Sequence, residues 1–168
     1  MDNIPVTTLT KSMVELLAEA YVGPPDANSP TWFNDNDPNA GIFSRIYPVS
    51  AKDASVSADG SGNPGTSVAS HTEHLRWSLA NANGAMRGEP YQSNWKASWT
   101  VTSVTEEQWN LLREKLRTEY ETIVESIEKQ EQLGGDYLNG LLALIPHAVY
   151  HLATIRQIIE RVEMMKQR

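Results

Sequence analysis

The stretch LIPHAVYHLATIRQIIERV, residues 144–162, indicates the fold class of this 168-residue chain. Apolar residues recur in it at spacings of three and four, the period at which side chains share one face of an α-helix. This stripe consists of Leu144, Ala148, His151, Ile155, Ile158 and Val162. The pattern predicts a long helix from about Tyr137 to Met165 with His151 in its core-facing seam and His147 one turn away.

Pro146 falls inside this predicted helix. Proline removes a backbone N–H and clashes with the preceding turn, which costs roughly 3 kcal/mol in a helix interior. Either the helix kinks just before His147, or a new helix begins at Pro146. The good helix-forming sequence from Tyr137 to Ile145 favours the kink.

Three further long helices are predicted, over about 6–22, 66–88 and 105–134. Gly23-Pro24-Pro25 ends the first, and Thr105 with Gln108 forms a capping box at the start of the third. The third helix carries a seam made of Trp109, Leu112, Leu116, Tyr120, Ile123 and Ile127. Gly134-Gly135 is expected to end it. Four amphipathic helices indicate an all-α chain that forms a four-helix bundle as one domain over 1–168.

The segments between the long helices are mostly polar. Residues 24–37 read as a long loop rich in Pro, Asn and Asp, which we expect to cover one end of the bundle. A short extra helix is predicted to begin at Asp37-Pro38, as an N-cap followed by proline at the first helical position, and to end near Pro48. Its apolar face would consist of Ile42, Phe43, Ile46 and Tyr47. Residues 90–104 are expected to be extended or irregular, with Trp95 and Trp99 as packing anchors.

All four histidines fall into two helical pairs, His71 with His74 and His147 with His151. Residues three or four apart lie on one face of a helix, so two such pairs suggest two helices whose imidazoles meet. Neutral imidazole is the commonest metal ligand, and three of them around an open position make a catalytic type of site. The alternative to a metal site is that the histidines are hydrogen-bonded polar residues at the edge of a bundle.

Composition excludes several classes of function. The chain has 14 Lys+Arg against 21 Asp+Glu, a net charge of −7, which argues against nucleic-acid binding. It has no cysteine, so disulfides and thiolate ligands are excluded, which fits a cytoplasmic protein. No segment reads as a membrane span or a signal peptide. A nucleophile elbow, a P-loop and a dinucleotide fingerprint are also missing.

Two segments resemble motifs of the DinB-like (YfiT-like) superfamily. They are Ser67–Leu75, SVASHTEHL, and His147–Ile158, HAVYHLATIRQI. With the spacing between them, the resemblance covers nearly the whole chain. It implies an up-down-down-up four-helix bundle in which His74, His147 and His151 bind a divalent metal, zinc or nickel. It also implies a homodimer, because relatives commonly pair through helix faces. Members include metal-dependent hydrolases and thiol-dependent transferases, so the substrate would be a small molecule such as a low-molecular-weight thiol.

Several neighbouring residues have alternative roles. His71 could be a fourth ligand, a hydrogen-bond partner of a ligand or a general base; we favour a pocket-lining base, because a fourth ligand would close the site. Glu73 is expected to be a solvated carboxylate and Arg156 an ion-pair partner. Trp77, Trp95 and Trp99 are expected in the core or an interface.

Two classes of function remain open. The first is a metalloenzyme in which three histidines leave a coordination position free for a substrate. The second is a metal-binding or stress-related dimeric bundle without turnover.

Overall fold

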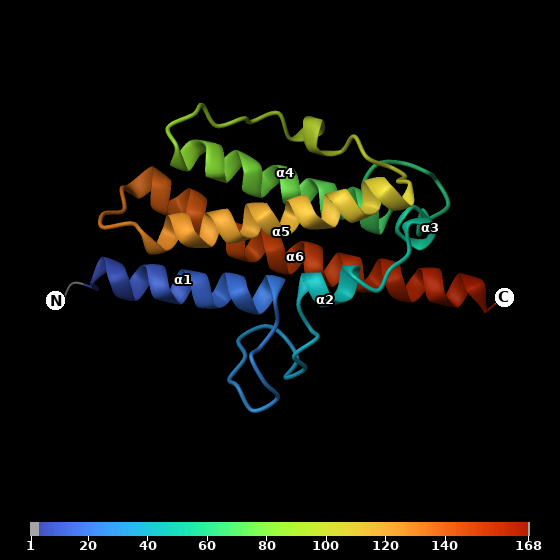
Figure 1. The fold of residues 1–168 in the computed structure, drawn as a ribbon, viewed down its shortest axis with the longest axis horizontal. Coiled ribbons are helices and arrows are strands. Elements are labelled where there is room, and N and C mark those ends of the chain that lie inside the picture. The colour runs from blue at the N-terminus through green and yellow to red at the C-terminus, as the bar shows by residue number, and fades with distance from the viewer. Residues whose placement is uncertain (1–3, 168) are drawn as a thin grey trace.

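The computed structural model describes residues 4–167, and over these residues the chain is helical with no strand (Figure 1). The predicted all-α class is confirmed. The elements are α1 (Val6–Tyr21), α2 (Ile42–Ile46), α3 (Ala51–Ala54), α4 (Val68–Met86), the 3-10 helix η1 (Trp95–Ser98), α5 (Glu106–Glu128) and α6 (Gly135–Lys166).

The four long helices pack against one another. α4 contacts α5 and α6, and α1 contacts the same two helices. All six residues of the predicted seam on α5 are buried, as are all six of the predicted stripe on α6. The capping box at Thr105 and Gln108 is present, with the Gln108 N–H donating to Thr105 Oγ1 and the Thr105 N–H donating to Gln108 Oε1. The helix period in the sequence therefore identified the core.

Several helix boundaries differ from those predicted. α2 begins at Ile42 with Gly41 as its N-cap, and not at Asp37-Pro38. α5 ends at Glu128 rather than at Gly134-Gly135, and Gly134 is instead the N-cap of α6. Ile127 is the last buried residue of the seam, and the polar residues after it have no apolar surface to cover, so helix formation stops there. α6 runs unbroken through Pro146, so the alternative of a new helix at Pro146 is wrong.

The long loop after α1 lies at the side of the helices, between α1 and α2, and not over one end (Figure 1). Glu19 of α1 is 7% exposed, and its carboxylate accepts the backbone N–H groups of Trp32, Phe33 and Asn34 at 2.9–3.0 Å. Arg156 of α6 donates to Asn34 Oδ1 at 2.7 Å. These contacts tie the loop to two helices.

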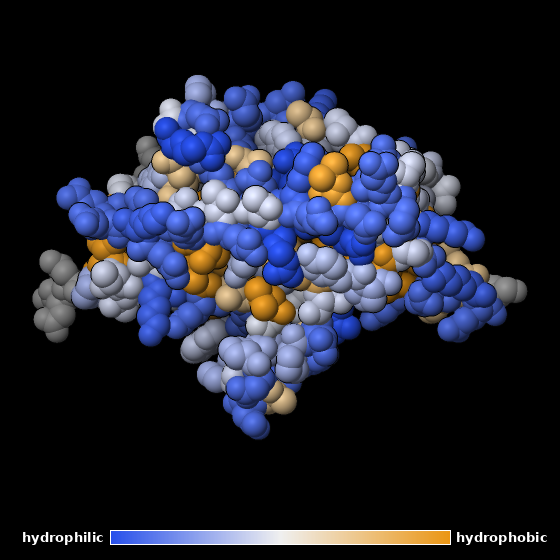
Figure 2. Space-filling model, in the orientation of Figure 1, coloured by the Kyte–Doolittle hydropathy of each residue, from blue (hydrophilic) through white to orange (hydrophobic). Residues whose placement is uncertain are grey.

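α6 is also long and apolar enough to cross a membrane, judged by length and composition. That test uses length and composition alone, and the expectation that no segment spans a membrane stays a prediction. The core helix of a water-soluble protein passes the same test, and α6 packs against α1, α2 and α4. The face seen in Figure 2 is mainly hydrophilic, with hydrophobic residues in small separate patches.

Candidate metal centre

The two histidine pairs meet between α4 and α6. His74 Nε2 lies 2.9 Å from His147 Nε2, which lies 3.1 Å from His151 Nε2. The three residues can each offer a ligand nitrogen with all three atoms within 4.8 Å of one another. Nitrogens that share one zinc-type ion at about 2.1 Å lie about 3.0–3.4 Å apart. The three histidines named from the sequence could therefore hold a metal ion.

Burial shields this cluster from water. His71, His74 and His151 are 4%, 5% and 2% exposed, and His147 is partly buried. The Trp99 ring stacks on the His74 ring, with centroids 4.0 Å apart and planes inclined by 14°. Trp95 also lies beside His74 and His147. Two indole rings from the irregular segment around η1 thus cover the imidazoles.

The hydrogen bonds of His71 assign the tautomer of His151. His71 Nε2 lies 3.0 Å from the carbonyl oxygen of Gly65, which can only accept, so Nε2 carries the proton. His71 Nδ1 is then an acceptor, and His151 Nδ1, at 2.8 Å, must donate to it. Neutral His151 therefore presents an unprotonated Nε2 to the cluster.

A second chain of hydrogen bonds assigns His74 in the same way. Ser98 Oγ donates to the Trp95 carbonyl at 2.6 Å, so it accepts from His74 Nδ1, also at 2.6 Å. That leaves His74 Nε2 without a proton. His147 Nδ1 lies 3.4 Å from Ser78 Oγ, a longer contact that leaves its tautomer open. At least two Nε2 lone pairs therefore lie next to His147 Nε2, where a cation could satisfy them.

Electrostatics keeps the imidazoles neutral. The pKa of His74 is lowered to about 4, chiefly by burial and then by His147 and His71. The pKa of His151 is lowered to about 2 by burial and by the other three histidines. Burial also lowers the pKa of His147 and of His71. Neutral imidazoles at pH 7 have free lone pairs, as metal ligation requires.

Glu73 and Arg156, the charged residues discussed in the sequence analysis, lie outside the histidine cluster. Glu73 accepts two hydrogen bonds from Arg76 at 2.7 Å and is partly buried, so the expectation of a solvated carboxylate is wrong. Arg156 pairs with Asp35 at 3.4 Å, in agreement with the expected ion pair. Trp77 packs on Trp95, with ring centroids 5.4 Å apart.

Gly65 and Ser98 are the site residues that sequence analysis missed. Each contributes an oxygen that sets the tautomer of an imidazole, directly or through His71. Both lie outside the long helices, and a glycine carbonyl has no side-chain chemistry to reveal it. Ser98 stands between Trp95 and Trp99, the two residues expected to anchor this segment, and that position was the one available clue.

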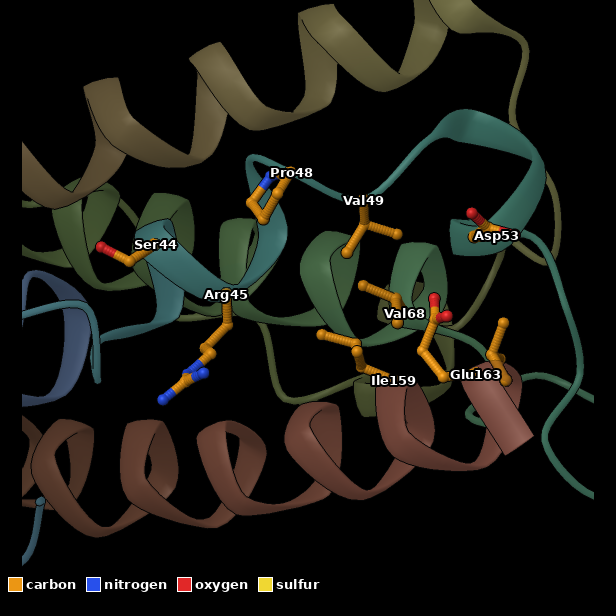
Figure 3. Close-up of a pocket in the computed structure, with 9 residues that line it drawn as sticks. Ser44, Arg45, Pro48, Val49, Asp53, Val68, Ile159 and Glu163 are labelled. Carbon is orange, nitrogen blue, oxygen red and sulfur yellow. The ribbon is translucent and has the colours of Figure 1, made fainter. Parts of the chain in front are cut away.

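Two cavities differ in their relation to the cluster. One, of about 750 Å³, lies between α4 and the first half of α6 and reaches His147 and Ser78. The other, of about 220 Å³, lies between α2, α3 and the ends of α4 and α6, and Figure 3 shows the charged residues Arg45, Asp53 and Glu163 among its lining. No histidine lines the smaller cavity, so the larger one is the approach to the candidate metal centre.

Comparison of the chain with protein-family models, with curated proteins and with solved structures found no match. The resemblance to the DinB-like superfamily therefore stays a prediction. The candidate metal centre is supported by the geometry of the histidines alone.

Proposed function

We propose that this chain is a DinB-like metal-binding protein that acts as a metal-dependent hydrolase or a low-molecular-weight-thiol transferase. His74, His147 and His151 would hold one divalent metal, zinc or nickel. The packing of α1, α4, α5 and α6 against one another supports the up-down-down-up four-helix bundle that this assignment implies.

One observation carries the proposal: His147 Nε2 lies 2.9 and 3.1 Å from the Nε2 atoms of His74 and His151, and hydrogen bonds to Ser98 and His71 leave those two atoms unprotonated. A purely structural cluster would need a proton between each pair of ring nitrogens. His147 Nε2 has at most one proton for its two neighbours at 2.9 and 3.1 Å. A metal ion bound between the three nitrogens would take the place of the missing proton.

A bound divalent metal supplies Lewis acidity, which polarises a carbonyl and lowers the pKa of a water or a thiol. The residues of the chain orient the three ligands and exclude water. Trp99 covers one face of His74, and the helix backbones of α4 and α6 fix the spacing of the pairs. No fourth histidine closes the site, because both ring nitrogens of His71 have other partners.

We propose for His71 a different role from the pocket base expected from the sequence. Its contacts with Gly65 and His151 favour the second alternative, in which it orients a ligand. We expect His71→Ala to weaken metal binding by about 10–100-fold, the usual effect of losing the hydrogen-bond partner of a metal ligand. Competition with a chromogenic chelator measures this change.

His71→Asn is the matched variant, since its amide oxygen lies near the position of Nδ1 and can accept from His151. It should bind metal more tightly than His71→Ala. Wild-type metal affinity in His71→Ala, combined with slower turnover, would instead establish His71 as a base.

The proposal is tested by elemental analysis of protein purified without a histidine tag, followed by turnover assays. We expect one divalent metal per chain, then hydrolysis or thiol conjugation within a broad substrate panel. Protein that binds no metal after incubation with zinc or nickel would contradict the proposal. A fully loaded protein without turnover would favour the non-catalytic bundle. The homodimer and the cytoplasmic location stay predictions.

A further inference from the structure

The larger cavity has an apolar lining and ends at the candidate metal centre. Its walls include Ala82 and Met86 of α4, Leu141 and Leu144 of α6, and the rings of Tyr91 and Trp95. Among the described side chains that line it, none is charged. Ser78 and His147 are polar groups at the end next to the histidines.

The cavity is elongated along α6. It is lined from Tyr137 to His147, and ten helical residues span about 15 Å. Its volume, about 750 Å³, falls within the range of about 300–1,000 Å³ of small-molecule sites. A single ligand could therefore reach from Tyr137 to the imidazole of His147.

Gly140 is a lining residue at which the cavity can be filled experimentally. It lies inside α6, where glycine is one of the least favourable residues for a helix. A Cβ atom at this position would meet no atom within 4 Å, so packing against neighbouring residues does not require the glycine. A larger side chain at this position therefore has room.

We infer that this cavity binds a neutral, mainly apolar small molecule whose one polar group lies at His147. The inference deepens the proposed function by naming the class of substrate that the metal centre receives. Away from the metal centre, an anionic group would lose its hydration without gaining a cationic partner from the lining, and the chain itself has a net charge of −7. A thiol that carries charged groups on the part away from the metal therefore does not fit this cavity.

Two fluorescent probes with the same ring system test the inference. N-phenyl-1-naphthylamine is neutral, and 8-anilinonaphthalene-1-sulfonate adds one sulfonate. We expect the folded, metal-free protein to bind the neutral probe at least about 10-fold more tightly, since one desolvated, unpaired charge readily exceeds 1.4 kcal/mol. Equal or tighter binding of the sulfonate, or no binding of the neutral probe, would overturn the inference.

Filling variants locate the probe. Gly140→Phe and Ala82→Phe each place a ring into the cavity from opposite walls, and we expect at least one of them to weaken neutral-probe binding about 10-fold or more. Gly135→Phe is the matched control at the start of the same helix, outside the cavity, and should bind the probe like the wild type. Unchanged binding in both filled variants would overturn the inference.

Elemental analysis of the same proteins separates this inference from the proposed function. A wild type that binds the neutral probe in this cavity but no metal contradicts the proposed function and leaves the cavity assignment intact. A wild type that binds metal but not the neutral probe contradicts the cavity assignment and leaves the proposed function intact. In the filled variants, metal content should equal that of the wild type.

Discussion

Replacing His151 with alanine is expected to abolish metal binding. The substitution deletes one of three ligand nitrogens, so the affinity should fall by more than the about 10–100-fold that a lost hydrogen-bond partner costs. The metal-loaded wild type should also lose a ligand-dependent stabilisation, about 2.7 kcal/mol when free metal is 100 times Kd. Chelator competition and thermal unfolding with and without added metal measure the two effects.

His151→Leu separates ligation from packing. His151 is 2% exposed and lies in the core stripe of α6, so alanine also leaves a cavity there. Leucine fills this volume without offering a nitrogen. We expect both variants to lose the metal, and His151→Leu to retain more of the stability of the metal-free protein. Wild-type metal affinity in either variant would show that His151 is not a ligand.

The helices were predictable because their seams depend on local spacing. Trp109 to Ile127 and Leu144 to Val162 repeat apolar residues at intervals that only a helix brings to one face, and all of these seam residues are buried. The end of α5 was misplaced because glycine is a frequent helix stop. The loss of buried partners after Ile127 ends the helix before Gly134 is reached.

The histidine cluster was predictable for the same reason, since the pairs have helical spacing. The contacts of His71 were not predictable, because its partners are the Gly65 carbonyl and an imidazole from another helix. The packing of Trp99 on His74 and the cavity beside His147 likewise arise from contacts between distant segments. Sequence spacing identifies which side chains share a face, and tertiary packing decides what each nitrogen contacts.

The hydrogen bonds of Glu19 to the loop after α1 are a further tertiary feature that no sequence motif predicts. It lies on α1 among apolar residues, and its Oε1 atom accepts the N–H groups of Trp32, Phe33 and Asn34. Asn34 in turn donates to the Glu19 backbone carbonyl and accepts from Arg156 of α6. The Glu19 carboxylate thus accepts hydrogen bonds from three consecutive backbone N–H groups, which would otherwise need water as their partner.

Glu19→Ala should destabilise the protein by about 3 kcal/mol, because hydrogen bonds to a charged group contribute about 1.5–3 kcal/mol each and loop solvation recovers part of that loss. Glu19→Gln keeps one acceptor oxygen and should cost less. Glu15→Ala, on the exposed side of the same helix, should change stability by no more than about 0.5 kcal/mol. Urea unfolding measures these differences, and hydrogen exchange should show faster amide exchange at residues 32–34 in Glu19→Ala. Equal stability of Glu19→Ala and Glu15→Ala would mean that the loop is held by Arg156 and its own turns, without the carboxylate.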